Sequence, residues 1–243
     1  ARDVYKRQTV FCQDVAQATG LPLSKIRNAV CNTENAPDSG TTSGSRQTLL
    51  TGEAVRGAAV KLADAMKEVD NDLEKLNGKN YFYEYYEPTD KLGADVPYPK
   101  SHIAYGFATH VVILDKKGKV TEVYAAHDSG KVVNPTSIQG QIEGGVLMGM
   151  GYALTEDWPL KDCVPQVTYG TLGLLRSTQI PNIHAIYIEK EKLLDVAYGA
   201  KGIGEIATIP TAPAVQGAYY ALDGKFRTKL PLEDTFYRPK AEE

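Results

Sequence analysis

Five glycines crowd one stretch of the chain that opens with the signals of a helix. Asn134 followed by Pro135 is typical of a helix N-cap and the first helical residue. The glycines that follow are Gly140, Gly144, Gly145, Gly149 and Gly151. Each costs about 1 kcal/mol relative to alanine in a helix interior, so something must offset the total. We expect this helix to approach another backbone or a cofactor closely, and packing against another helix is the alternative.

A second glycine-rich segment, residues 198–213, leads to a carboxylate. Its glycines are Gly199, Gly202 and Gly204, and Glu205 follows directly. Thr211 then offers the start of a helix, with Gly224 as its stop. The pattern predicts a tight loop that carries Glu205 into a helix. Two interpretations are open, a solvated glutamate on a turn and a general base on a loop that nothing bulky shields.

A polar loop is predicted for residues 32–47, which contain no hydrophobic residue except Ala36. Small polar residues in such a run are typical of a surface loop or linker. The alternative is a ligand-binding loop, because backbone N–H groups and hydroxyls can wrap an anionic, oxygen-rich ligand.

These segments resemble the molybdenum hydroxylases, the xanthine dehydrogenase and aldehyde oxidase family. Gly202-Ile203-Gly204-Glu205 matches the Gly-x-Gly-Glu sequence that carries the family's catalytic glutamate. Residues 128–135 match its Asp-x-Gly-x-x-x-Asn-Pro signature, and residues 140–145 match Gly-Gln-x-Glu-Gly-Gly. The motifs fall in the family's order, and the resemblance runs from Thr9 to about Tyr237.

The resemblance implies a role for individual residues. Glu205 is the implied catalytic general base. The backbone of Gly44 is implied to face the metal. The other implied cofactor-binding residues are Ser43, Ser45, Gln47, Gln141, Lys201 and Gly202.

The implied activity is oxidative hydroxylation of a purine of the xanthine or hypoxanthine type, with water as the oxygen source. Residues 125–128, 170–173 and 226–232 look most like the selenium-dependent xanthine dehydrogenases. A hydroxylase for aldehydes or other N-heterocycles is a second interpretation. A non-catalytic cofactor-binding or assembly subunit is a third.

The implied cofactor is molybdenum-molybdopterin, expected as a dinucleotide with a terminal selenium or sulfur. The resemblance places FAD and 2Fe-2S centres on upstream parts or partner subunits, and it implies a homo-oligomer of the complete enzyme. The first half of the molybdenum domain has no counterpart in this sequence. We therefore expect this chain by itself to hold neither a competent cofactor nor activity.

The expected fold class is α+β, the C-terminal part of a molybdopterin-binding domain, in two subdomains with mixed sheets and packed helices. The first subdomain spans residues 9–80, an extended crossing 81–101, and the second subdomain 102–243, with 1–8 as an unplaced or artificial start. Expected elements are helices at 9–19 and from Thr51 to Asn77-Gly78, a brief strand at 26–30, a hairpin at 103–126 and a strand at 184–189. His102 and His110 are expected to be structural or solvent-facing.

Charge and cysteine content narrow the partners and the compartment. A net charge of −3 with dispersed signs gives no basic footprint for nucleic acid or a membrane surface. The longest nearly uncharged stretch, residues 144–154, is about half of what a bilayer span needs. The three cysteines have no metal-ligand spacing, which favours a reducing compartment, and we expect the cytoplasm.

Overall fold

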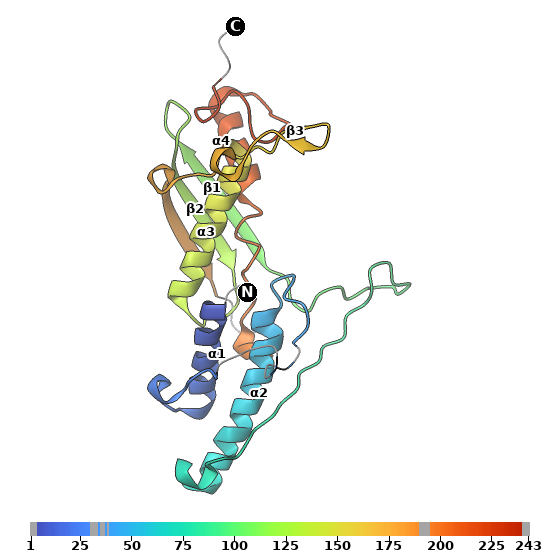
Figure 1. Cartoon of the computed structure of the whole chain (residues 1–243), viewed down its shortest axis with the longest axis vertical. Coiled ribbons are helices and arrows are strands. Elements are labelled where there is room, and N and C mark those ends of the chain that lie inside the picture. The colour runs from blue at the N-terminus through green and yellow to red at the C-terminus, as the bar shows by residue number, and fades with distance from the viewer. Residues whose placement is uncertain (1–3, 30–33, 35–36, 38, 190–194, 240–243) are drawn as a thin grey trace. The chain divides into compact units, whose positions relative to one another are not determined.

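The computed structural model describes residues 4–29, 34, 37, 39–189 and 195–239, and these form two compact units (Figure 1). The first unit comprises the described residues of Ala1–Tyr105, Ser129–Pro135 and Glu189–Gly202. The second comprises those of Gly106–Asp128, Thr136–Ile188 and Ile203–Glu243. The chain changes from one unit to the other between residues 135 and 136, at the start of the first glycine-rich stretch, and between residues 202 and 203, within the second. The division into subdomains 9–80 and 102–243 stays a prediction.

Two helices dominate the first unit and pack against each other (Figure 1). They are α1 (Val4–Thr19) and α2 (Gln47–Glu68), and short 3₁₀ helices lie at η1 (Leu23–Lys25), η2 (Leu73–Leu76) and η5 (Ala197–Gly199). Residues 81–101 contain no regular helix or strand, and their role as an extended crossing stays a prediction.

The boundaries of α2 differ from those expected. The helix starts at Gln47, four residues before Thr51, and Arg46 at its N-cap makes no side-chain cap hydrogen bond. It ends at Glu68, well before Asn77, because Asp70 and Asn71 take left-handed φ values of 53° and 62°. The strand expected at 26–30 is wrong for residues 26–29, which are irregular, and residue 30 lies outside the described residues.

The second unit contains a three-stranded mixed sheet in the order β1-β2-β5. Strands β1 (Phe107–Leu114) and β2 (Val120–Asp128) form the expected antiparallel hairpin, with Gly118 at φ 84° in the turn. Strand β5 (Asn182–Ile188) pairs with β2 in parallel. A small hairpin of β3 (Leu160–Lys161) and β4 (Val164–Pro165) and the 3₁₀ helices η3 (Tyr169–Thr171) and η4 (Ser177–Gln179) lie between. Helices with a mixed sheet confirm the α+β class.

Helix α3 (Pro135–Leu154) begins at Pro135 as expected and carries the glycine run. A Cβ on Gly145 would lie 2.7 Å from the backbone carbon of Ala207, and one on Gly149 would lie 2.8 Å from the carbonyl oxygen of Thr208. The expected close approach to another backbone is therefore confirmed at these two glycines. A Cβ on Gly140 or Gly144 would meet nothing within 4 Å.

Helix α4 (Thr211–Asp223) has the expected limits, and Gly224 follows it in the left-handed conformation at φ 72°. Residues 226–239 are irregular, as expected for the described part of the tail. The core of the second unit combines residues of α3, α4 and the sheet. Its fully buried apolar side chains include Val123, Ala125, Ile142, Val146, Met150, Val215 and Leu232.

Among the described residues, none of the helices has both the length and the apolar character needed to cross a membrane.

Candidate active-site loops

The eight predicted site residues are divided between the two units. Glu205 and Gln141 belong to the second unit. The first unit holds the remaining residues Ser43, Gly44, Ser45, Gln47, Lys201 and Gly202.

The polar loop of the first unit turns sharply just before α2. Gly44 and Ser45 both have left-handed φ values, 58° and 55°, and the Arg46 amide donates to the Ser43 carbonyl oxygen at 3.3 Å. Ser43 and Gly44 are exposed. The two left-handed residues make a sharp turn, and its backbone is exposed at Gly44.

Gln47 is the first residue of α2, and its side chain is buried. Its Nε2 donates to the Ser39 carbonyl oxygen at 3.3 Å, and its Oε1 accepts a hydrogen bond from the Thr51 hydroxyl. Thr51, expected from the sequence to cap the helix, instead lies within it and donates to the Gln47 side chain one turn earlier. These contacts fix Gln47 at the base of the polar loop.

Gly202 and Ser45 are in direct contact in the first unit. A Cβ on Gly202 would stand 1.5 Å from the Ser45 carbonyl oxygen and 2.9 Å from the Ser45 Cβ. Only glycine allows the two backbones to lie this close. The structure therefore brings together two residues that the sequence assigns to one cofactor from positions far apart in the chain.

Lys201 is held by both its backbone and its side chain. Its amide donates to the Ser129 carbonyl oxygen at 3.0 Å, and its Nζ donates to the Tyr105 carbonyl oxygen at 2.9 Å. The Lys131 amide donates in turn to the Gly199 carbonyl oxygen at 3.0 Å. The segments 129–131 and 199–201, which belong to separate sequence motifs, therefore lie side by side, a pairing that the sequence does not reveal.

Glu205 lies exposed in the second unit, on a run of turns that leads directly into α4. Its carbonyl oxygen accepts a hydrogen bond from the Thr208 amide at 3.1 Å. The loop-to-helix placement predicted for this carboxylate is confirmed. The Gln141 Nε2 of α3 donates to the Ile203 carbonyl oxygen at 3.3 Å, so Gln141 binds the same loop two residues before Glu205.

A buried histidine pair lies behind the start of α4. The Nε2 atoms of His110 and His127 are 2.8 Å apart, and the His110 Nδ1 is 3.0 Å from the Thr211 hydroxyl. Burial, together with the neighbouring His127, lowers the pKa of His110 to about 4. His110 is thus structural, one of the two roles expected for it. Sequence reasoning did not identify its partners, because they come from different elements.

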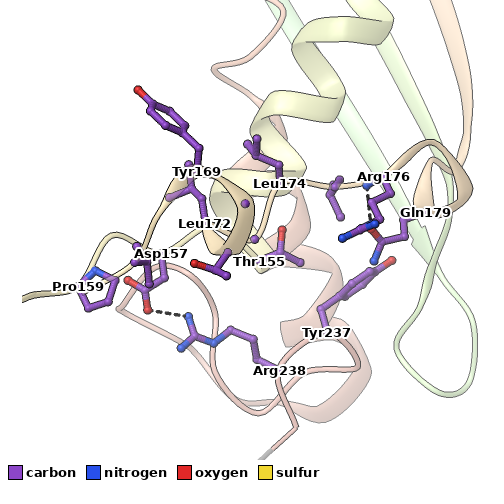
Figure 2. Close-up of a pocket in the computed structure, with 15 residues that line it drawn as sticks. Thr155, Asp157, Pro159, Tyr169, Leu172, Leu174, Arg176, Gln179, Tyr237 and Arg238 are labelled. Atoms are coloured by element: carbon purple, nitrogen blue, oxygen red, sulfur yellow. Dashed lines mark hydrogen bonds and ion pairs between the residues drawn. The ribbon is translucent and has the colours of Figure 1, made fainter. Parts of the chain in front are cut away.

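A pocket of about 730 Å³ lies elsewhere in the second unit (Figure 2). The labelled side chains around it include Thr155, Tyr169, Tyr237 and the ion pair of Asp157 with Arg238 at 3.2 Å. None of the eight predicted site residues lines it. Within the described part of the chain, no group of three His, Cys, Asp or Glu residues is placed to hold a metal ion.

Comparisons with known proteins match most of the chain. The family model described as the molybdopterin cofactor-binding domain matches residues 7–181. The gamma subunit of the 6-hydroxypseudooxynicotine dehydrogenase complex of Paenarthrobacter nicotinovorans is 29% identical over 262 residues, covering 93% of this chain and 33% of that protein. The putative xanthine dehydrogenase molybdenum-binding subunit of Escherichia coli is 26% identical over 259 residues, covering 92% and 34%.

A solved structure shares the fold. The aldehyde oxidoreductase from Desulfovibrio gigas aligns with a TM-score of 0.75 at 24% identity, over 90% of this chain and 26% of that one. At this identity the alignment shows the fold alone. The chain spans about a third of the length of the two curated relatives named above.

Proposed function

Because the chain belongs to the molybdopterin cofactor-binding domain family of the molybdenum hydroxylases, we propose that the protein carrying it oxidatively hydroxylates a small electron-poor molecule. The observation that carries the proposal is the loop of residues 202–205. It ends in an exposed carboxylate, Glu205, that leads directly into α4. An exposed carboxylate on a loop is a suitable position for a general base, which must come within hydrogen-bond reach of the proton it takes.

The first-unit residues fit a molybdopterin cofactor in two respects. Gly202 lies against the Ser45 carbonyl oxygen with no room for a side chain, which fixes the segment of Lys201 and Gly202 beside the polar loop. The hydrogen-bond donors here are suited to an anionic, oxygen-rich group. Ser43 and Ser45 carry hydroxyls, Lys201 carries an ammonium, and the backbone of Gly44 is exposed in a left-handed turn. These residues, with Gly202, Gln47 and Gln141, would hold the cofactor, and the Gly44 backbone would face the metal.

Each loop then has a separate task. When bound, the cofactor supplies the two-electron oxidant and activates water. Glu205 would take up one proton from water as the water oxygen bonds to the substrate carbon. The C–H bond at that carbon would break, its two electrons passing to the oxidant and its proton to solvent. Gln141 keeps the Glu205 loop in place through the Ile203 carbonyl oxygen, because the two atoms are 3.3 Å apart.

We propose a purine of the xanthine or hypoxanthine type as the substrate. Two observations support this substrate. The sequences of residues 125–128, 170–173 and 226–232 resemble those of xanthine dehydrogenases, and one relative is named as a putative xanthine dehydrogenase subunit. A second candidate is an aldehyde or another N-heterocycle, favoured by relatives named aldehyde oxidoreductase and isoquinoline 1-oxidoreductase. A terminal selenium or sulfur on the metal and a dinucleotide form of the cofactor belong to the same proposal.

The partners and the compartment follow from the same reasoning. Electrons would pass to 2Fe-2S and FAD modules, on the rest of the polypeptide or on other subunits of a homo-oligomeric enzyme. Cys12 and Cys163 are free thiols, which favours the reducing environment of the cytoplasm.

The test is dye reduction by the complete, cofactor-loaded protein beside its Glu205→Gln and Glu233→Gln variants. General acid–base catalysis contributes about 10²- to 10⁴-fold, so Glu205→Gln should lower kcat by that factor. Glu233, an exposed residue paired with Lys229 at 3.0 Å, is the matched control and should leave kcat unchanged.

The substrate panel separates the candidates. Oxidation of xanthine or hypoxanthine supports the purine proposal, while oxidation of aldehydes or quinoline alone keeps the hydroxylase and replaces the substrate. Molybdenum-loaded protein that oxidises none of them would favour a non-catalytic cofactor-binding or assembly subunit.

A further inference from the structure

The turn that precedes Lys201 and Gly202 has a conformation that side chains rarely adopt. Ala197, Tyr198 and Gly199 have consecutive φ values of 48°, 54° and 82°. Glycine tolerates this region, but alanine and tyrosine crowd their own carbonyl groups there. Such a turn persists only where its surroundings hold it.

Glu53 of α2 holds this turn from one side. Its side chain is only 3% exposed, and Oε2 accepts a hydrogen bond from the Ala197 amide at 2.6 Å. A carboxylate that accepts from a backbone N–H makes one of the stronger hydrogen bonds in proteins. Gly52 of α2 also faces this turn, since a Cβ there would lie at an ordinary contact distance of 3.5 Å from the Ala197 Cβ.

Arg56, one helical turn further along α2, completes the clamp. Its Nε and Nη2 donate to the two carboxylate oxygens of Glu53 at 2.8 and 2.5 Å, and its guanidinium carbon lies 5.8 Å from the Tyr198 ring centroid. Although burial acts to raise the pKa of Glu53, the bonds from Arg56 and the Ala197 amide hold it below its usual value. Glu53 is therefore a paired, charged acceptor.

The turn leads without a break to the predicted cofactor residues. The Gly199 carbonyl oxygen and the Lys201 amide are bonded to segment 129–131, and Gly202 rests against the Ser45 carbonyl oxygen. Only three residues separate Ala197 from Lys201. If the turn relaxed at Ala197, Lys201 and Gly202 would therefore move with it.

We infer that Glu53 is a positioning residue for the proposed active site, acting through the Ala197 amide to fix where Gly202 meets Ser45. This inference rests on the proposed function and extends it to a side chain that neither touches substrate nor belongs to a motif. Arg56 supports Glu53 by compensating its buried charge. Neither residue takes part in proton transfer.

The test compares Glu53→Ala, Glu53→Gln and Asp64→Ala in the complete protein. Asp64 is the matched control, because it forms an exposed i,i+3 pair with Lys67 at 2.8 Å on the same helix. Misplacement by about 1 Å can cost about 100-fold, so Glu53→Ala should lower kcat per bound molybdenum by roughly 10- to 100-fold with little change in KM. Glu53→Gln keeps an oxygen for the Ala197 amide but loses the charge pair with Arg56, so its loss should be smaller than that of Glu53→Ala.

Hydrogen exchange supplies a readout that needs no turnover. In Glu53→Ala, amides 197–202 should exchange at least about tenfold faster than in wild type, while Asp64→Ala leaves them unchanged. Faster exchange with kcat per molybdenum unchanged, or a lower melting temperature alone, would overturn the positioning role and leave the proposed function standing. Wild-type protein that contains neither pterin nor activity would instead refute the proposed function, and unchanged exchange would refute the clamp itself.

Discussion

The carbonyl oxygen of Ser45 and the α-carbon of Gly202 lie so close that a methyl group on Gly202 would stand 1.5 Å from that oxygen. The replacement Gly202→Ala therefore forces the two segments apart by more than an ångström. Overpacking of this kind costs typically about 1–3 kcal/mol, and here it also moves the proposed cofactor surface. We expect a lower melting temperature and a several-fold loss of bound pterin in the complete protein. Gly217→Ala, where a Cβ would meet nothing within 4 Å, is the control and should retain the pterin.

The neighbouring glycines of α3 should respond in opposite directions. Gly144→Ala should stabilise the chain by about 1 kcal/mol, because nothing lies near its Cβ position and alanine favours the helix. Gly145→Ala should destabilise it despite that gain, since the new methyl group would lie 2.7 Å from the Ala207 backbone. Urea unfolding of the two variants measures the difference. Equal midpoints would contradict the close packing of α3 against the segment that follows Glu205.

Asp14 should make the protein less stable as the pH rises. Burial raises the pKa of this side chain from 3.8 to about 7, so the folded state keeps a proton that the unfolded state has lost. Its contribution is full below about pH 4 and is lost as the pH rises to about 7, by up to about 4 kcal/mol at about 1.4 kcal/mol per pKa unit. Asp14→Asn should remove this loss and raise the unfolding free energy at pH 8. A pH profile identical to that of wild type would refute the assignment, and exposed Asp64→Asn is the control.

His110 should act in the opposite direction. Its pKa is lowered from 6.5 to about 4, so its contribution is full above pH 6.5 and is lost as the pH falls toward 4. His110→Gln keeps an amide within reach of the Thr211 hydroxyl and removes the titration. We expect a flatter loss of stability between pH 6.5 and pH 4 in this variant, measured by chemical denaturation. A slope identical to that of wild type would contradict this assignment.

Elements with strong local signals were predictable from the sequence. The hairpin of β1 and β2, the start of α3 at Pro135 and the end of α4 at Gly224 all depend on turn and cap residues that lie within a few positions. The limits of α2 were not predictable in this way. Gln47 opens the helix without a capping side chain, and its burial is a tertiary effect.

The site was predictable only in part, for a related reason. The glycine motif at residues 199–205 indicates that loop and its one carboxylate, Glu205. Glu53 and Asp14 look in sequence like ordinary charged residues of amphipathic helices, and only packing shows that both are buried. The contact of Gly202 with Ser45 joins residues more than 150 positions apart, which no local pattern reports.

The parallel pairing of β2 with β5 has a consequence for synthesis on the ribosome. Strand β2 can pair with β1 as soon as the hairpin emerges, but its other edge must wait for roughly 50 further residues before β5 appears. At about 5–20 residues per second, that edge stays unpaired for roughly 3–10 s. An open strand edge is a template for association with other chains. Nascent molecules should therefore be most dependent on chaperones during this interval.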